Sequence, residues 1–360
     1  MLLRLRPGLY QAWRRPGRLQ IGLDARHGVV LDGLEAADER LVTALAEGTT
    51  LPRLLRLAAR LQVPEQRVHD LLAELRAARA LAAPPTVRSR LARLPDVSRR
   101  RLAPDATVLG VAHPDGDGWH VLAARRTRCV GVVGAGRTGL AVATGVAAAG
   151  VGCVLVDDAS PVRAGDVAPG GYTGEDVGRP RDVAARDVLA RCCPDTRTAA
   201  RGRVRPDVLV LVGHGVLDPS RADALLREDV AHLAVTWGEA GVVVGPFVVP
   251  GRSSCLRCQH LHRTDRDPEW PRLVAQLVGR RAVDVPPAEE GSLAALAAAL
   301  ATVQVLTHLD GGVVPATDAT LEVGLPEAAI AVRAWPAHPR CGCVRLPGVA
   351  GSAGTATMRT

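Results

Sequence analysis

One glycine-rich turn constrains the fold of this chain more than any other feature. Gly134, Gly136 and Gly139 directly follow an apolar run that ends at Val133, and they open a stretch whose apolar residues have helical spacing. In such a turn the first glycine permits a tight bend, the second lets a phosphate approach the backbone, and the third lets helix and strand pack closely. The amino end of the helix then attracts the anion. The turn therefore predicts a nucleotide-binding, Rossmann-like unit.

An acidic residue follows where such a unit would hold a ribose. Asp157 closes the next apolar run, 18 residues after Gly139, and its carboxylate could accept hydrogen bonds from sugar hydroxyls. Arg137 adds a cation inside the turn. The turn alone does not choose between NAD and ATP. A turn retained around a pocket that binds neither would show the same pattern.

Alternating strands and helices follow the turn. This pattern is typical of an α/β fold with a mostly parallel sheet and helices on both faces. The expected strands are 129–133, 151–156, 208–212, 231–236 and 241–249, and the expected helices are 137–149, 179–191, 220–228 and 292–309.

A small separate module is expected before this domain. A β-hairpin at 18–34 precedes three helical stretches at 36–47, 51–62 and 65–81, an order typical of a winged-helix module. Residues 105–128 are expected to form one or two strands, at 108–112 and 119–123. The predicted domain plan is a basic arm at 1–17, the module at 18–82, a Pro/Arg-rich linker at 83–104, an α/β domain at 105–345 and a flexible tail at 346–360.

The basic residues narrow the function classes. All 45 are arginines, which excludes a phosphate-loop NTPase of the Gly-Lys-Ser/Thr kind and any lysine Schiff base. The net charge of +8 originates in residues 1–20 and 83–103, which together carry +10, so a folded basic groove for nucleic acid is not expected. Residues 21–82 contain eight Arg against nine acids, a balance that disfavours DNA binding. No apolar run reaches the roughly 18–20 residues of a membrane span, so a cytoplasmic protein without membrane contact is predicted.

Four of the eight cysteines form two close pairs, Cys255 with Cys258 and Cys341 with Cys343. Four thiolates at these spacings could hold one tetrahedral Zn²⁺ in a closed structural site, which leaves no open position for catalysis. Reduced cysteines without a metal, or a redox pair, are the alternatives at this point.

Other cysteines and histidines carry weaker signals. Cys192 and Cys193 fall at an expected helix end, and no cysteine has an obvious position for a thioester. Three histidines near the cysteine pairs could replace a thiolate, although solvated loop positions are the simpler interpretation. They are His260, His262 and His338.

Taken together, the motifs resemble the E1-like, ThiF/MoeB-type activating-enzyme superfamily, whose members adenylate the C-terminus of a ubiquitin-like protein or a peptide. The resemblance covers residues 128–343. Besides the glycine turn it rests on Val156-Asp157, on Asp176-Val-Gly-Arg-Pro-Arg181, and on the segment 244–251 that leads into the cysteine pairs. It implies an E1-like fold, a homodimer, structural zinc, and ATP with Mg²⁺ as ligands.

Three features of that family are altered. Its Asn-Leu-x-Arg-Gln segment is replaced within 164–173, its phosphate-contacting lysine falls at Arg181, and its Mg²⁺-binding Asp falls near His214, with Asp218 four residues later. Adenylyl transfer depends on positioned cations and metal. These departures predict weak adenylation or none, although Arg137 could substitute in part.

The module at 18–82 resembles the peptide-recognition modules that bind leader peptides in the biosynthesis of ribosomally made, modified peptides. Its fusion to an E1-like domain resembles the leader-peptide-binding partner proteins of azoline-forming cyclodehydratases. The expected function is a ThiF-family protein that binds a peptide or ubiquitin-like protein client beside a separate modifying enzyme. An active ATP-dependent adenylyltransferase is the main alternative. An NAD-dependent oxidoreductase and a winged-helix DNA-binding protein are further alternatives.

A client peptide could add as an extra strand to the edge of the predicted hairpin. Four apolar residues lie near this edge, and they are explained more simply as the module's own core. They are Ile21, Leu23, Val29 and Leu31.

Overall fold

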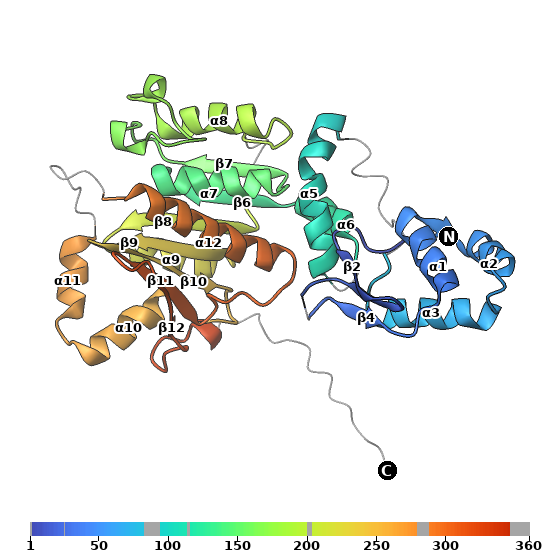
Figure 1. Ribbon diagram of the computed structural model, residues 1–360. Coiled ribbons are helices and arrows are strands. Elements are labelled where there is room, and N and C mark those ends of the chain that lie inside the picture. The colour runs from blue at the N-terminus through green and yellow to red at the C-terminus, as the bar shows by residue number, and fades with distance from the viewer. Residues whose placement is uncertain are drawn as a thin grey trace, which may run out of the picture. The chain divides into compact units, whose positions relative to one another are not determined.

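The computed structural model in Figure 1 describes residues 2–24, 26–82, 94–113, 116–199, 204–278 and 288–345. The chain forms two compact units, Met1–Ala124 and Arg125–Thr360, and each is described by itself.

The amino-terminal unit combines small antiparallel sheets with helices. Its three-stranded sheet has the order β2-β3-β4, and β1 pairs separately with β5. The predicted hairpin and the three helices after it are confirmed, and their leucines and valines form one buried core. The elements are β1 (Leu2–Leu3), β2 (Gln11–Arg15), β3 (Arg18–Ile21), β4 (Val29–Leu31), α1 (Ala36–Glu47), β5 (Thr49–Thr50), α2 (Leu51–Arg60), α3 (Glu65–Ala77), α5 (Asp96–Ala112) and α6 (Gly118–Arg125).

The prediction that residues 1–17 form a solvated basic arm is wrong. Pairing of β1 with β5 and of β2 with β3 orders this segment, and Leu3 and Leu5 are buried. Two leucines at alternating positions supply enough apolar surface to anchor a strand. The predicted basic arm rested on the number of arginines and left this apolar surface out of account.

The linker and the two strands expected between 94 and 123 are also wrong. Helix α5 occupies 96–112 and helix α6 covers 119–123. Leu102, Ala106 and Leu122 are buried together. Burial at helical spacing therefore outweighed the strand preference of the β-branched valines. The rest of the predicted linker, 83–93, lies outside the described residues, as does the predicted tail at 346–360.

The second unit is built on one seven-stranded sheet of order β12-β11-β10-β9-β8-β6-β7. Strands β7, β6, β8 and β9 are parallel neighbours, and β9 to β12 pair antiparallel. The predicted α/β class is confirmed. The unit starts at Arg125 and not at residue 105. Its strands are β6 (Cys129–Val133), β7 (Cys153–Asp157), β8 (Val208–His214), β9 (Ala231–Trp237), β10 (Gly241–Val248), β11 (Ala319–Gly324) and β12 (Ile330–Ala334).

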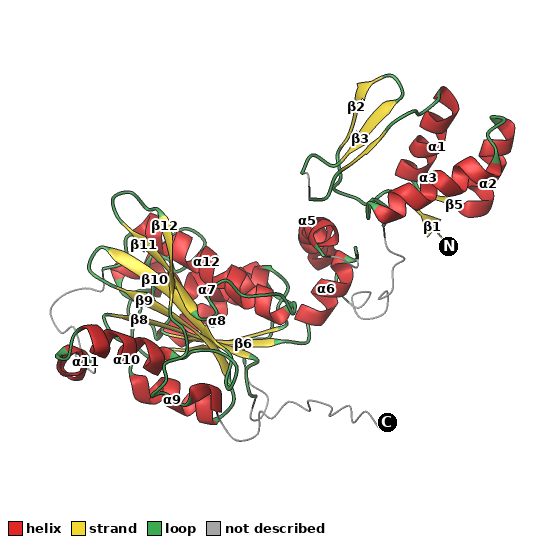
Figure 2. Cartoon of the chain, turned by 90° about the horizontal axis from the view of Figure 1, so that it is seen from below, coloured by secondary structure: helices red, strands yellow, loops and turns green. Residues whose placement is uncertain are grey.

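Helices lie on both faces of this sheet, as predicted. Helices α7 and α12 pack against each other on one face, while α9 and α10 lie on the other (Figures 1 and 2). Val, Ala and Leu dominate the buried core, joined by Trp237 and Phe247. The helices are α7 (Arg137–Ala148), α8 (Arg181–Cys192), α9 (Pro219–Arg227), α10 (Leu256–Arg266), α11 (Trp270–Leu277) and α12 (Gly291–Leu309), and the short 3-10 turns are Ala164–Asp166, Gly174–Asp176 and Cys343–Arg345.

Helix α12 is long and apolar enough to cross a membrane by length and composition alone. The sequence prediction considered only uninterrupted apolar runs and did not identify this helix. In the structure its buried side chains, Leu293 and Val305 among them, belong to the core of the second unit. The apolar composition of α12 is therefore explained by packing.

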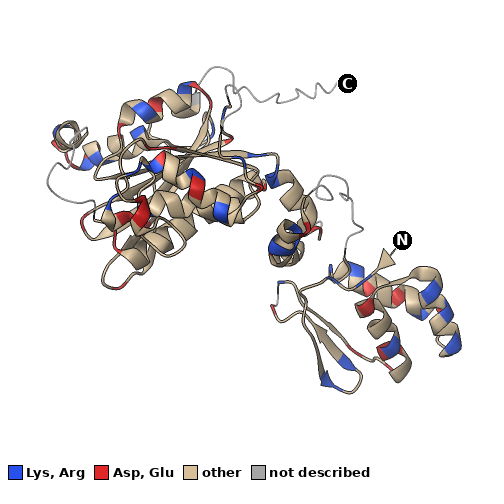
Figure 3. Cartoon of the chain, turned by 90° about the horizontal axis from the view of Figure 1, so that it is seen from above, with Lys and Arg blue, Asp and Glu red and all other residues tan. Residues whose placement is uncertain are grey.

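The amino-terminal unit carries charges of both signs. Figure 3 shows basic and acidic segments on its helices, while helix α2 contains Arg53, Arg56 and Arg60 and no acidic residue. Arg67, on α3, forms an ion pair with the buried Asp38, on α1, so the positive charge of this arginine is compensated. That nucleic acid is not the ligand stays a prediction.

Candidate functional site

The glycine turn adopts the geometry that the sequence predicts. Gly134 has φ +82°, and a Cβ there would lie 2.3 Å from the carbonyl oxygen of Val212. A Cβ on Gly139 would lie 1.8 Å from the carbonyl oxygen of Gly134, so the third glycine lets α7 pack on the turn. A Cβ on Gly136 would lie 3.3 Å from Oε1 of Glu289. A protein carboxylate therefore borders the space that the second glycine keeps clear.

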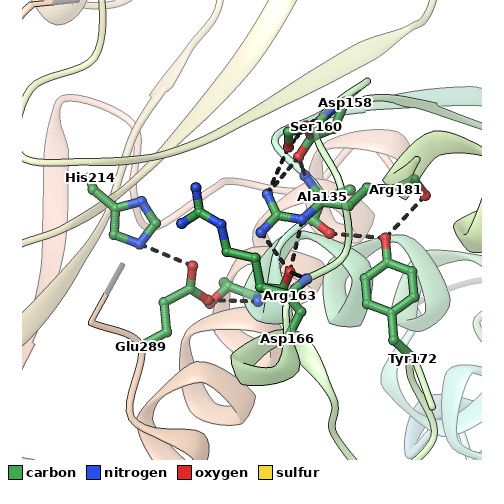
Figure 4. A network of polar contacts seen from close by, with 10 residues as sticks. Ala135, Asp158, Ser160, Arg163, Asp166, Tyr172, Arg181, His214 and Glu289 are labelled. Atoms are coloured by element: carbon green, nitrogen blue, oxygen red, sulfur yellow. Dashed lines mark hydrogen bonds and ion pairs between the residues drawn. The ribbon is translucent and has the colours of Figure 1, made fainter. Parts of the chain in front are cut away.

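Glu289 binds the start of α7 at the position predicted for a phosphate. Its Oε2 accepts hydrogen bonds from the backbone N–H of Thr138, at 2.9 Å, and from the Thr138 hydroxyl, at 2.6 Å. Its Oε1 lies 3.0 Å from Nε2 of His214, as Figure 4 shows. Only 8% of the Glu289 side chain is exposed. A buried anion at a helix amino end is stabilised by the unpaired N–H groups and the helix dipole.

A second carboxylate binds the turn itself. Oδ2 of Asp158 accepts a hydrogen bond of 2.7 Å from the backbone N–H of Ala135. The same oxygen lies 3.1 Å from Nη1 of Arg181, whose Nε and Nη2 donate to Asp166 at 2.9 and 2.6 Å. Arg181 therefore keeps the charge of the family's lysine, but that charge is compensated by two acidic side chains (Figure 4).

Tyr172 braces this arrangement from within the core. Its hydroxyl lies 3.0 Å from the carbonyl oxygen of Ala135 and 3.1 Å from that of Arg181, and its side chain is fully buried. Burial raises the pKa of Tyr172 above its ordinary value, so the hydroxyl keeps its proton as a donor. The segment 164–173 thus supplies two structural groups, Asp166 and Tyr172.

The remaining predicted nucleotide residues lie around this centre. Asp157 ends β7 with an exposed carboxylate whose Oδ2 is 3.1 Å from Nη2 of Arg221. Arg137 donates from Nη1 to the carbonyl oxygen of Glu289 at 2.9 Å, so it holds the same segment that fills the turn. Asp218 is the N-cap of α9, where it accepts from the Ser220 N–H, and it lies outside this network.

Burial and hydrogen bonding act in opposite directions on the two carboxylates of the turn. Burial raises the pKa of Glu289, but hydrogen bonds from His214 and Thr138 outweigh it and leave the pKa below its ordinary value. Burial likewise raises the pKa of Asp158, and donors from Ser160 and Ala135 together with Arg181 outweigh it. Both groups are therefore ionised at neutral pH.

Sequence reasoning missed Asp158, Asp166 and Glu289. The only local signal was the Asp157-Asp158 pair at the end of a strand. The sequence prediction named Asp157, but Asp158 is the residue that contacts the glycine turn. Glu289 is about 150 residues from the turn, and its placement follows from the way α12 packs on α7. No spacing pattern encodes such a contact.

The four paired cysteines converge as predicted. Their sulfur atoms lie within 4.8 Å of one another, with Sγ–Sγ distances of 3.9 Å (Cys255–Cys258), 3.5 Å (Cys255–Cys341) and 3.4 Å (Cys258–Cys343). Tetrahedral zinc, with Zn–S bonds of about 2.3 Å, separates its sulfur ligands by about 3.8 Å. The donor set and its spacing therefore fit a metal of this kind.

One sulfur of the cluster has a backbone donor. The N–H of His338 lies 3.3 Å from Sγ of Cys258. Such donors to sulfur orient and stabilise metal-bound thiolates. The cluster joins the start of α10 to the carboxyl-terminal segment of the described chain.

The nearby histidines make other contacts and are not simply solvated loop residues. His338 is buried, with Nε2 2.8 Å from Oδ2 of Asp265. His262 bonds the carbonyl oxygen of Pro336, and His260 accepts at Nδ1 from the indole N–H of Trp270 at 3.1 Å. None of these histidine side-chain contacts is with a sulfur of the cysteine cluster.

The other four cysteines are not ligands of this cluster. Cys193 is buried and Cys192 is exposed at the end of α8, in agreement with the sequence prediction. Cys129 and Cys153, which the sequence suggested were isolated, face each other across β6 and β7 with their sulfurs 2.9 Å apart. Burial raises the pKa of the Cys129 thiol, which makes it a poor nucleophile.

With this geometry established, comparison with solved structures identifies the fold. The microcin C7 biosynthetic enzyme MccB in complex with N-formylated MccA has a TM-score of 0.69 over 96% of this chain and 100% of that one, at 14% identity. The chain has the E1-like, ThiF-type fold.

Two further structures with this fold support the assignment. E. coli MccB with ATP matches at a TM-score of 0.68 and 15% identity, over 95% of this chain and 99% of that one. PaaA matches at a TM-score of 0.68 and 13% identity, over 91% of this chain and 98% of that one. No protein-family model and no curated protein matches the sequence. The E1-like fold is thus shared across the length of the chain with little conserved sequence.

Proposed function

We propose that this E1-like protein binds a peptide client for a separate modifying enzyme, and that its own nucleotide site is filled by protein carboxylates. The fold is that of a peptide-processing enzyme, since the compared MccB structures include complexes with the MccA peptide. The proposed role is modified-peptide biosynthesis, with the amino-terminal unit as the recognition module.

The observation that carries this proposal is the occupation of the glycine turn by Glu289. An ATP phosphate would need the Thr138 N–H and the space beside Gly136, and Glu289 engages both. The buried cation Arg181 is shared by Asp158 and Asp166. The carboxylates of Asp158, Asp166 and Glu289 repel a triphosphate, because like charges in a partly buried site interact strongly, and they oppose the attraction of the guanidinium groups at the turn.

The amino-terminal unit offers an open strand edge for the client. Strand β3 is paired on both sides, so β4 is the free edge of the hairpin. Of the four apolar residues predicted near this edge, Ile21 and Leu31 are buried core, while Leu23 is 67% exposed. Val30, on β4, is also exposed. Unpaired backbone groups with an adjacent apolar side chain are the features that β-strand addition uses.

The cysteine cluster is proposed to hold structural zinc. Bound to four thiolates, the metal would have no open position and would act only as a cross-link. It would tie Cys255 and Cys258 on α10 to the segment that carries Cys341 and Cys343. This role leaves the peptide-binding proposal unchanged.

Calorimetry on metal-assayed protein tests the nucleotide part of the proposal. ATP with Mg²⁺, and NAD in a second titration, are expected to show no binding at micromolar concentration. Micromolar ATP binding that weakens in Asp157→Ala would overturn it, because the predicted ribose contact would then be in use. Pyrophosphate exchange with candidate peptides would follow.

Peptide selection tests the client part. Short peptides selected for binding to the full chain are expected to protect the β4 amides, Val29–Leu31, from hydrogen exchange. Val30→Pro, which an edge strand tolerates, is expected to abolish this protection. Protection confined to the second unit would contradict the proposed docking edge.

Active ATP-dependent adenylation is the second candidate. Two observations favour it: the glycine turn keeps its geometry, and Asp157 remains exposed at the end of β7. It requires Glu289 to leave the turn when the nucleotide binds. The same titration decides between the candidates. The homodimer implied by the resemblance and the cytoplasmic location predicted from the sequence stay predictions, and light scattering of the purified chain tests the first.

A further inference from the structure

A small cavity within the amino-terminal unit is lined mainly by basic side chains. It encloses about 100 Å³ where four segments meet: the segment after β1, the turn between β3 and β4, the end of α3 and the end of α5. None of the described lining residues is acidic. The basic residues that line it are Arg6, Arg26, His27, Arg79 and His113.

Arg6 is the buried member of this group. Only 7% of the residue is exposed, and its Nη1 donates to the carbonyl oxygen of Val111 at 3.4 Å. Its Nε is buried without a hydrogen-bond partner, and in the described part of the chain its guanidinium forms no ion pair. A buried charged donor without a partner is costly, because its lost hydration is not replaced. Arg6 therefore has an unmet demand for an acceptor.

Arg79 adds a second positive charge at the rim of the cavity. It is exposed just after α3, and among the described residues it has no ion pair. Burial lowers the pKa of Arg6, and the charge of Arg79 lowers it further, so the two guanidinium groups lie close enough to repel each other. The backbone of Arg79 has φ +53°, a conformation that favours glycine at the end of a helix.

Arg26 and His27 have a counter-charge of their own. Nη2 of Arg26 lies 2.8 Å from Oδ2 of Asp24, and Nδ1 of His27 lies 3.4 Å from the same oxygen. Asp24 is not among the described residues that line the cavity. The uncompensated charge is therefore that of Arg6 and Arg79.

Charge and size together select the ligand. Two guanidinium groups without an acidic partner match a dianion, and the planar fork of arginine fits the paired oxygens of a tetrahedral oxyanion. A carboxylate would leave one of the two charges uncompensated. At about 30 Å³ per water molecule, the cavity has the volume of roughly three waters. This space admits one compact oxyanion and is too small for pyrophosphate or a nucleotide.

We propose that the cavity between Arg6, Arg79 and the turn at 26–27 binds a free tetrahedral dianion, inorganic phosphate or sulfate. The anion accepts hydrogen bonds from the guanidinium groups of Arg6 and Arg79, and it links the segment after β1 to the end of α3. This site belongs to the amino-terminal unit alone and depends neither on the peptide client nor on the glycine turn.

The test uses the full-length, metal-assayed chain near neutral pH and at constant ionic strength. Calorimetric titration with sodium phosphate, and separately with sodium sulfate, is expected to show saturable binding of about one anion per chain. Each dianion is also expected to raise the midpoint of thermal unfolding, because it binds only the folded state. Acetate is expected to bind at least about tenfold more weakly. The tighter of the two dianions identifies the source of the ligand.

Variants with a matched control locate the site. Arg79→Gln is expected to weaken phosphate binding by about tenfold or more. Arg79→Gly removes the same charge and suits the positive φ, so it is expected to weaken binding equally without lowering the stability of the free protein. Arg76→Gln is the control: Arg76 is exposed on the same helix, does not line the cavity, and its loss is expected to leave binding unchanged.

A variant of the buried cation separates charge from geometry. Arg6→Lys keeps the positive charge and loses the planar fork, so it is expected to weaken phosphate binding in a chain that still folds. Urea unfolding of the anion-free variant checks that it folds.

Several outcomes would overturn the proposal. Equal weakening in Arg76→Gln and Arg79→Gln would reduce the effect to general charge attraction. Unchanged binding in Arg79→Gly, or a midpoint of unfolding raised no more by phosphate than by chloride at equal ionic strength, would also contradict it. If phosphate binds as expected but no peptide is selected, the proposed function is lost while this site stands. If peptides protect β4 but neither dianion binds, only this inference is lost.

Discussion

The glycine turn and the cysteine cluster are both places where residue spacing predicts a ligand, and the structure treats them in opposite ways. At the cluster, four sulfurs converge to within 4.8 Å of one another. At the turn, the donors that would bind phosphate already have partners: Ala135 N–H binds Asp158, and Thr138 N–H binds Glu289.

This difference separates two kinds of sequence signal. The cysteines are themselves the ligands, so their spacing predicts the site almost completely. A glycine turn only creates space and exposes backbone donors. Which anion fills that space depends on side chains elsewhere in the chain. Here the anion is Glu289, which is distant from the turn in the sequence and lies just before α12.

The largest expected effect concerns the cluster. Cys258→Ser removes a buried sulfur ligand, so we expect metal content to fall from about one per chain to near zero and the free energy of unfolding to fall by about 4 kcal/mol. Elemental analysis and urea unfolding measure both. Cys192→Ser, at an exposed cysteine, should change neither. Unaltered metal content in Cys258→Ser would show that the four cysteines do not hold the metal, and the contrast with the glycine turn would be lost.

The next largest effect concerns the buried cation of the turn. Arg181→Gln leaves Asp158 and Asp166 without their cation, at a cost of about 3 kcal/mol in the free energy of unfolding. Arg179→Gln, two residues earlier, breaks pairs of a more exposed guanidinium with Asp176 and Asp187 and should cost less than Arg181→Gln. Urea midpoints of the two variants check this. Equal losses would mean that the Arg181 network does not stabilise the turn.

Removing the protein's own anion sharpens the comparison directly. Glu289→Ala leaves the Thr138 N–H unpaired, which should cost about 1–2 kcal/mol of stability. It should also allow ATP or inorganic pyrophosphate to bind where the wild type binds neither, as calorimetry would show. Glu290→Ala removes the N-cap of α12, which also lowers stability, and should bind neither anion. Identical anion binding by wild type and Glu289→Ala would contradict the filled-turn proposal.

The smallest effect is a pH dependence. The pKa of Glu289 is lower in the folded chain than its ordinary value of 4.5, so the folded state binds fewer protons than the unfolded state in that range. Its contribution is therefore complete above the ordinary value and is lost as pH falls through the folded pKa. Unfolding midpoints between pH 7 and pH 3 should fall less steeply in Glu289→Gln than in the wild type. Parallel curves would assign the acid sensitivity to other carboxyls.

Much of the fold was predictable because its signals are local. The five strands from β6 to β10, the helix after the glycine turn and the hairpin with three helices all follow from hydrophobic period and turn chemistry. Strands β11 and β12 and helices α10 and α11 were not predicted. The failures are equally physical. Valines at 108 and 111 suggested a strand, but Leu102 and Ala106 bury a helical face, and burial outweighs intrinsic strand preference.

The site divides along the same line. Gly134, Gly139 and the four cysteines behave as their spacing predicts, since each acts through its own backbone or sulfur. Arg181 was correctly placed near the turn, but its charge is compensated by Asp166, 15 residues before it, in a segment with no recognisable pattern. Pairings of this kind are set by tertiary packing and become visible only in the folded chain.

The attachment of Glu289 to the first turn of α12 has a consequence in terms of mass action. A soluble nucleotide competes for the glycine turn by its concentration, whereas a carboxylate carried on the same chain is present at an effective concentration fixed by its tether, which is millimolar even for a flexible link. Here the tether is a helix packed into the core. Changes in nucleotide supply would then leave the turn unaffected, and its state would follow the conformation of α12 instead.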